Sequence, residues 1–99
     1  MSTAGTRKSI FITGAASGMG LETARLFAAG GWFVGGYDVN EAGLAALEAE
    51  LGAANCIARR LDVTDREAYR GALAEFATAT GGRLDLLFNN AGIGKGGRF

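Results

Sequence analysis

The stretch TGAASGMG, residues 13–20, decides the fold of this chain because it joins a short apolar segment to an amphipathic one. Its glycines stand at positions 14, 18 and 20. A chain that leaves a buried strand and turns at once into a helix favours glycine, because positive φ angles and close backbone contacts exclude larger side chains. The stretch therefore predicts a strand, a tight glycine loop and a helix in direct succession.

The segments around this loop alternate between short β-like runs and longer helical stretches, which is the pattern of βαβ units. Strands are expected at residues 9–13, 32–39, 56–63 and 84–90. Glycine pairs end the helices at Gly30, Gly31, Gly81 and Gly82, whereas Asn40 caps the second helix and a Thr64–Glu67 capping box starts the third. Right-handed crossovers then predict a doubly wound α/β sheet with three helices.

Composition limits what the protein does. The 99 residues suffice for one domain, and ten basic and ten acidic side chains give zero net charge, which argues against a nucleic-acid partner. No apolar stretch approaches the ~20 residues that span a bilayer, and residues 1–8 lack the apolar core of a signal peptide. We therefore expect no membrane partner and a cytoplasmic location.

The inventory of reactive side chains is short. The chain has no histidine, which excludes Ser-His-Asp and Cys-His catalysis from its own residues. Its single cysteine, Cys56, excludes an internal disulfide and a multi-cysteine metal site. We expect no metal site, and we interpret Cys56 as a small buried side chain rather than a reactive thiol.

The glycine loop has the features of a phosphate-binding turn. Its backbone can approach a pyrophosphate closely, and N–H groups at the start of the following helix attract phosphate oxygens. The alternative is a glycine-rich turn that serves only the strand-to-helix connection, since the spacing differs from GxGxxG. The position of the loop between a strand and an amphipathic helix favours nucleotide binding.

At this point the sequence resembles the short-chain dehydrogenase/reductase family. The family motif TGxxxGxG is matched by Thr13, Gly14, Gly18 and Gly20, and the resemblance continues at LDV, residues 61–63, and DLLFNNAG, residues 85–92. It covers residues 8–99. The resemblance implies a Rossmann-type parallel sheet with strand order 3-2-1-4. It also implies an oxidoreductase that transfers hydride between a nicotinamide cofactor and a carbonyl or alcohol substrate.

Asp38 is the candidate for binding the adenosine ribose. It ends the second expected strand at about the offset from the glycine loop at which an acid accepts bonds from ribose hydroxyls. The alternative is a solvated turn aspartate. Family members that use NADP usually offer a basic residue at the positions held here by Ser17 and Val39, so the resemblance implies NAD in preference to NADP.

The other cofactor contacts are implied by the resemblance. Asp62 is expected to accept a hydrogen bond from the adenine amine, and Val63 to pack beside the adenine ring. The alternative is that Asp62 is only a loop residue. Met19 is expected either to lie beside the cofactor or to pack in the core. Asn89 and Asp85 are interpreted as structural. The complete set expected to bind cofactor is Gly14, Ser17, Gly18, Met19, Gly20, Asp38, Asp62, Val63, Asn90, Ala91 and Gly92.

The catalytic part of the family pattern is absent from these 99 residues. Tyr37 and Tyr69 are followed four residues later by Glu41 and Leu73, so neither forms the family's Tyr-x-x-x-Lys. We expect a flexible tail at residues 1–7 and, at 8–99, a truncated Rossmann domain without catalytic residues. The alternative is a non-catalytic nucleotide-binding or purely structural fragment, and the substrate is not encoded.

Truncation also predicts an exposed sheet edge. With strand order 3-2-1-4, the apolar segment at residues 84–90 lies at the outside of the sheet. The backbone groups of an unpaired apolar edge strand can pair with a strand of another chain, so we expect self-association through this segment.

Overall fold

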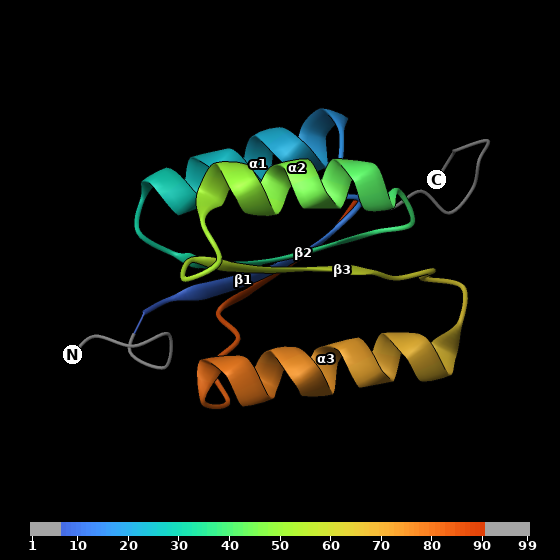
Figure 1. The fold of residues 1–99 in the computed structure, drawn as a ribbon. Helices are drawn as coiled ribbons and strands as arrows, with labels where there is room; N and C mark the ends of the chain where they lie inside the picture. Colours follow the sequence, from blue (N-terminus) through green and yellow to red (C-terminus); the bar gives the residue numbers. More distant parts are fainter. Residues whose placement is uncertain (1–6, 91–99) are drawn as a thin grey trace.

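Residues 7–90 form a four-stranded parallel sheet with helices on both faces. They are the part of the chain that the computed structural model describes. The strands are β1 (Ser9–Thr13), β2 (Phe33–Asp38), β3 (Cys56–Arg60) and β4 (Leu86–Asn89), in the order β3-β2-β1-β4. Helices α1 (Gly18–Ala29) and α2 (Glu41–Leu51) cover one face, and α3 (Arg66–Thr80) covers the other (Figure 1). The predicted α/β class, strand order and helix number are confirmed.

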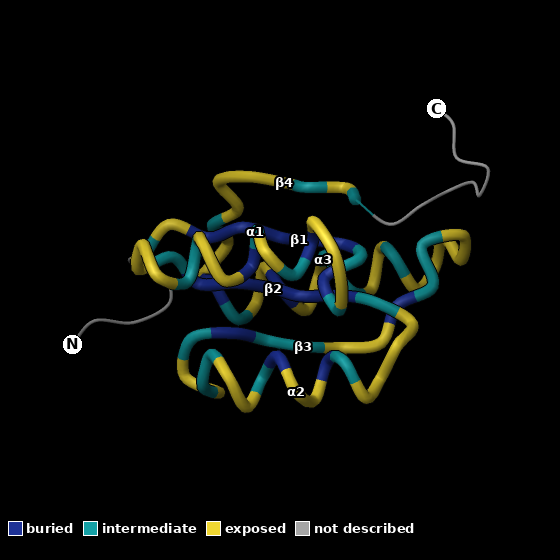
Figure 2. The backbone as a smooth tube through the Cα atoms, turned by 90° about the horizontal axis from the view of Figure 1, so that it is seen from above, coloured by how far each residue is buried: buried dark blue, intermediate teal, exposed yellow. Residues whose placement is uncertain are grey.

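The two central strands are the most deeply buried part of the sheet (Figure 2). Successive β1 side chains point to opposite faces. Ile10 and Ile12 therefore join the core beneath α1 and α2, whereas Phe11 joins the core beneath α3 and stacks on Tyr37 with ring centroids 4.3 Å apart. Cys56 is buried in the first of these cores, where burial raises the pKa of its thiol, in agreement with a packing role.

Glycines in β2 allow helices to approach the sheet closely. A Cβ on Gly35 would lie 2.6 Å from the Phe76 ring of α3, and a Cβ on Gly36 would lie 2.9 Å from Leu47 of α2. Both distances are too short for real carbon contacts, so these helices pack directly against the strand backbone. The close packing of α2 and α3 on β2 therefore depends on this pair of glycines.

The prediction that Thr64 and Glu67 form a capping box is wrong. Asp65 is the N-cap of α3, and its carboxylate accepts from the Ala68 N–H at 3.1 Å. Thr64 is held elsewhere, because its N–H and hydroxyl both donate to Asp62, at 3.0 and 2.6 Å. By contrast, Asn40 caps α2 as expected by accepting from the Gly43 N–H.

Three expected strands are shorter in the structure. Trp32 and Val39 lie outside β2, β3 ends at Arg60, and β4 begins at Leu86. Trp32 instead contacts the last turn of α1. Its N–H donates to the Phe27 carbonyl, and its ring packs edge-on against the Phe27 ring. Helix-terminal contacts thus replace strand pairing at this boundary.

Side-chain bonds fix the start of the edge strand β4. The Ser9 N–H donates to the Asp85 carboxylate at 2.8 Å, and the Arg83 guanidinium donates to the same carboxylate at 2.8 Å. The bond from Arg83, followed by that from Ser9, holds the pKa of Asp85 below its usual value. Asp85 therefore has the structural role expected for it.

The ends of the chain are only partly covered. Residues 1–6 of the expected tail lie outside the described residues, whereas the Arg7 guanidinium donates to the Asn55 side chain at 3.0 Å. Ala91 and Gly92 also lie outside them. Between residues 7 and 90, no helix has the length and apolar character needed to cross a bilayer.

Candidate functional site

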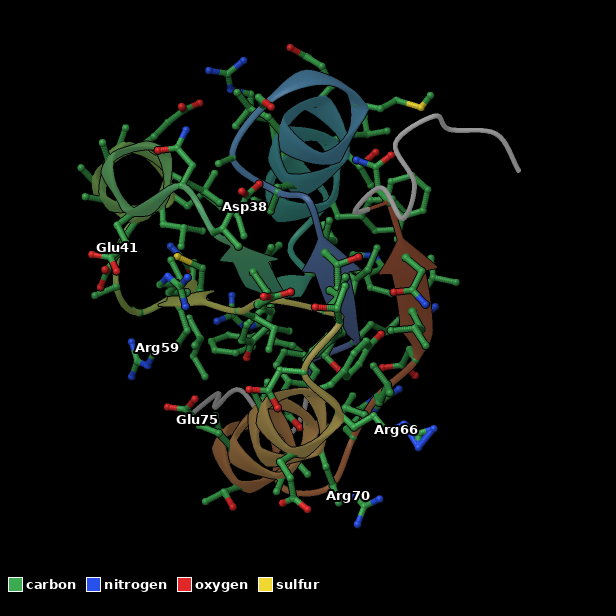
Figure 3. All side chains as sticks on the ribbon, turned by 90° about the vertical axis from the view of Figure 1, so that its right-hand side faces the viewer. Asp38, Glu41, Arg59, Arg66, Arg70 and Glu75 are labelled. Carbon is green, nitrogen blue, oxygen red and sulfur yellow. The ribbon has the colours of Figure 1, made fainter. Side chains whose placement is uncertain are left out.

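A pocket of about 350 Å³ lies at the edge of the sheet where the parallel strands end. In open α/β sheets, ligands bind outside the carboxyl ends of the strands. Figure 3 looks onto this edge, with Asp38 between the starts of α1 and α2. The pocket is lined by Gly14, Ser17, Asp38, Val39, Leu61, Asp62, Val63, Thr64 and Asn90.

The glycine loop is folded back onto the end of β2. The N–H groups of Gly14 and Ala15 both donate to the Tyr37 carbonyl, at 2.7 and 3.1 Å. Gly14 and Gly18 have φ angles of 71° and 57°, in the left-handed region that favours glycine. A Cβ on Gly20 would lie 1.9 Å from the Gly14 carbonyl oxygen, so the helix reaches the loop only because this position has no side chain.

The start of α1 leaves backbone donors open. Ser17 is the N-cap, but its side chain makes no capping bond, and the first turn contains no acidic residue. The N–H groups of residues 17–20 have no hydrogen-bond partner within the described part of the chain. Such donors, together with the positive end of the helix dipole, attract an anion.

Asp38 joins the glycine loop to the end of β2. One carboxylate oxygen accepts from the Ala16 N–H at 2.9 Å, and the other accepts from the Asn40 N–H at 3.0 Å. The bond to Ala16 excludes the interpretation of Asp38 as a merely solvated turn residue. A carboxylate accepts about four hydrogen bonds, so each oxygen retains capacity for a ligand hydroxyl.

Asp62 and Val63 form the opposite wall of the pocket. Hydrogen bonds from the Thr64 hydroxyl and then its N–H lower the pKa of Asp62, which therefore stays an ionised acceptor at neutral pH. Val63 is half-buried and packs against the core beneath α3. The wall thus combines a fixed acceptor with an apolar surface.

The end of β4 completes the site. The Asn90 side-chain amide donates to the Gly14 carbonyl at 3.3 Å and lines the pocket. The neighbouring Asn89 oxygen accepts from the Thr13 hydroxyl at 3.1 Å and from the Tyr69 hydroxyl at 2.8 Å. Asn89 therefore ties β4 to β1 and α3, as its structural interpretation required.

The structure does not bring every expected residue into the pocket lining. Met19 is 64% exposed and is not a lining residue, so its interpretation as a core side chain is wrong. Sequence reasoning missed Leu61 and Thr64, which line the pocket. The available signal was that Leu61 and Thr64 flank Asp62 and Val63 in the sequence, but the sequence interpretation assigns Thr64 to a helix cap instead.

Neither tyrosine is placed as a catalytic group in this pocket. Tyr37 is fully buried under α3, and its hydroxyl has no hydrogen-bond partner in the described structure. The Tyr69 hydroxyl is bound to Asn89. Among residues 7–90, no three histidine, cysteine or acidic residues are grouped so as to hold a metal ion.

Comparison with known proteins identifies relatives of this chain. A family model described as short chain dehydrogenase matches residues 8–99. "Probable oxidoreductase EphD" of Mycobacterium bovis is 45% identical over 92 residues, which are 91% of this chain and 15% of that protein. "Serine 3-dehydrogenase" of Agrobacterium fabrum is 48% identical over 89 residues, which are 88% of this chain and 34% of that protein.

A solved structure shares both the fold and the sequence pattern. A short-chain dehydrogenase/reductase from Burkholderia phymatum, solved in complex with NAD, superposes with a TM-score of 0.83 at 35% identity. The match covers 94% of this chain and 34% of that chain. The present chain therefore spans about a third or less of these relatives.

Proposed function

The chain belongs to the short-chain dehydrogenase family, and from this premise we propose that it forms the part of an NAD-dependent oxidoreductase that binds the adenosine half of the cofactor. The observation that carries the proposal is the open start of α1 beside the anchored Asp38. Nicotinamide dinucleotides belong to the chemistry of this family.

The glycine loop fits the cofactor's diphosphate. The open N–H groups of residues 17–20 supply donors for anionic oxygens, and the absent side chain at Gly20 lets α1 pack against the loop that presents them. This explains how a chain with zero net charge binds a dianionic group. Gly14, Gly18 and Met19 belong to the same turn, with Met19 at its exposed rim.

Asp38 fits the adenosine ribose and supports NAD over NADP. Its two oxygens are fixed by Ala16 and Asn40 and can accept further bonds from the 2′ and 3′ hydroxyls. A 2′-phosphate at this position would meet like charge. Ser17 and Val39, which line the same pocket, offer no compensating cation.

The opposite wall fits the adenine ring. Asp62 is held as an ionised acceptor suited to the exocyclic amine, and Val63 supplies an apolar surface. Asn90 holds the loop at Gly14. We extend the proposed contacts to Ala91 and Gly92, which follow Asn90 directly.

When bound, the nicotinamide of this cofactor exchanges a hydride with substrate. The residues of this chain bind and orient the adenosine end, while Tyr37 and Tyr69 are engaged in packing and in a structural hydrogen bond. We therefore propose that the 99 residues as given bind cofactor without catalysing hydride transfer. The alternative is a purely structural fragment that binds no nucleotide.

Calorimetric titration with NAD, NADP and AMP tests this proposal. NAD is expected to bind more tightly than NADP, and AMP is expected to bind weakly at the adenosine end. The absence of heat with all three compounds would favour the structural fragment. Equal affinity for NAD and NADP would contradict the ribose assignment while leaving the phosphate assignment intact.

We also propose that the free edge of β4 pairs with a second copy of the chain. Leu84, Leu86 and Leu87 are exposed along this edge, and Figure 2 shows it at the outside of the described sheet. Antiparallel pairing of two such strands would satisfy open backbone groups and cover the leucines. Light scattering during size-exclusion chromatography tests this pairing, and a monomer at high concentration would contradict it.

A further inference from the structure

Two consecutive arginines end β3 and pair with glutamates on opposite faces of the sheet. Arg59 Nε lies 3.0 Å from Glu75 Oε2 of α3, on one face. Arg60 Nε lies 3.7 Å from Glu41 Oε2 at the start of α2, on the other. Figure 3 shows Glu41 beside α2 and the Arg59–Glu75 pair on the α3 side.

Arg60 is the arginine on the side of the sheet that holds α1 and α2. It is the register partner of Asp38 across β2 and β3, and the next residue, Leu61, donates its N–H to the Asp38 carbonyl at 2.9 Å. Asp38, Leu61 and Asp62 all line the pocket. Arg60 is therefore attached to the backbone that forms the adenosine end of the site.

The charge of Arg60 reaches the pocket. After the two hydrogen bonds from Thr64, the positive charge of Arg60 is a further cause of the lowered pKa of Asp62. The side chains of Arg60 and Glu41 are both largely exposed, and their 3.7 Å separation is longer than that of a good hydrogen bond. Such an exposed pair adds little to stability, and loss of Glu41 leaves Arg60 without the ion-pair partner seen here.

We propose that Glu41 is a positioning residue that strengthens the preference for NAD by pairing with Arg60 and so biasing its side chain toward the start of α2. Held there, the guanidinium is kept from the 2′ position of the ribose, so that a 2′-phosphate meets Asp38 and Glu41 without a compensating cation. This inference rests on the proposed binding of NAD at Asp38. It assigns a role in specificity to a residue outside the pocket lining.

Replacing Glu41 with glutamine tests the inference by titration with NADP and NAD at low ionic strength. The Glu41→Gln change removes one negative charge and releases Arg60, so the affinity for NADP should rise by roughly fivefold, the order expected for one unit charge near a protein surface. The affinity for NAD should change by less than about twofold, because the ribose hydroxyls carry no charge. High salt should reduce the gain for NADP.

The adjacent pair supplies a matched control. Glu75→Gln removes the same charge from the partner of Arg59 but on the α3 face, so it should leave the ratio of NADP to NAD affinity unchanged. Adding Arg60→Gln to Glu41→Gln should cancel most of the gain, because the released cation is then absent. Urea unfolding of each variant verifies that the exposed substitutions leave the fold intact.

The outcomes separate this inference from the proposed function. A rise in NADP affinity that depends on Arg60 supports the role of Glu41. An unchanged affinity ratio in Glu41→Gln, or an equal rise in Glu75→Gln, overturns that role while NAD binding by the unmodified chain still supports the proposed function. Failure of the unmodified chain to bind NAD overturns both.

Discussion

The start of α1 and the start of α3 solve the same physical problem in opposite ways. Every helix begins with N–H groups that lack intrahelical partners. At α3, Asp65 accepts one of these groups and Glu67 adds negative charge in the first turn. At α1, Ser17 makes no capping bond and no acid follows, although serine is among the best capping residues.

The α2 start shows that α1 is the exception. Asn40 caps α2 in the same way as Asp65 caps α3, and Glu41 occupies its first turn. Only the α1 start lies at the glycine loop that borders the pocket. Among the described helices, a side chain therefore caps one donor at the starts of α2 and α3, whereas no side chain caps α1, where an anion is proposed to bind.

Gly20→Ala should have the largest effect, because it obstructs the packing of α1 against its own loop. The new Cβ would lie 1.9 Å from the Gly14 carbonyl oxygen, so the loop must move. We expect the free energy of unfolding in urea to fall by about 3 kcal/mol, and NAD binding to be lost.

Gly71→Ala is the matched control within α3. No atom lies within 4 Å of a Cβ at this position, so alanine should stabilise the helix by about 0.5–1 kcal/mol. Unchanged stability and NAD binding in Gly20→Ala would show that the loop tolerates a side chain and would contradict the proposed close approach.

Asp38→Ala tests the anchor beside the open helix end. Loss of charge-assisted bonds to the ribose should weaken NAD by roughly 10- to 100-fold in calorimetry. NADP should lose less, because the repulsion of its 2′-phosphate disappears as well. The substitution also removes the bond to Ala16, which affects both cofactors, so the difference between them is the informative quantity. An equal loss would count against the ribose role.

Ser17→Asp would make the α1 start resemble that of α3. A carboxylate there should stabilise the cofactor-free protein by about 0.5 kcal/mol through the helix dipole, yet weaken NAD about tenfold by repelling its diphosphate. Asp65→Ala gives the converse, with a loss of about 1 kcal/mol of stability and no change in NAD affinity. Equal effects of the two variants on NAD would remove the distinction between these helix ends.

Tyr37→Phe concerns the core beneath α3 and should leave the open helix end unaffected. The buried hydroxyl has no partner in the described structure, so its removal should raise the free energy of unfolding by about 1 kcal/mol. Burial, with a smaller contribution from Glu75, raises the pKa of Tyr37 above its ordinary value of 10. Lower stability in the variant at pH 7 would indicate that the hydroxyl is satisfied.

The pH dependence provides a second readout of Tyr37. Above pH 10 the unfolded chain releases the phenol proton while the folded chain retains it, so the unmodified protein should lose stability as pH rises. This stability component is fully present below pH 10 and should be absent from Tyr37→Phe. Urea unfolding between pH 8 and pH 11, about one unit on either side of a tyrosine's ordinary pKa, measures the difference.

The location, the self-association, the absence of catalysis and two cofactor contacts were predicted from the sequence and are not tested by the structure. The cytoplasmic location, the pairing of two copies through β4 and the absence of catalysis by the 99 residues stay predictions. The cofactor contacts of Ala91 and Gly92 lie outside the described residues. The fold and family, in contrast, are established.

The sequence by itself determined the βαβ alternation, the strand order, the glycine loop and the position of Asp38 at the end of a strand. The alternation and the glycine loop depend on local periodicity and on glycine's missing Cβ, and the strand order follows the Rossmann pattern that the sequence motifs indicate. Tertiary structure alone decided that Asp65 caps α3, that Asp38 binds Ala16, that Arg60 faces Glu41 and that the Tyr37 hydroxyl is unpartnered. Each of these depends on which of several competing partners a polar group meets, and that choice is made only when the elements pack.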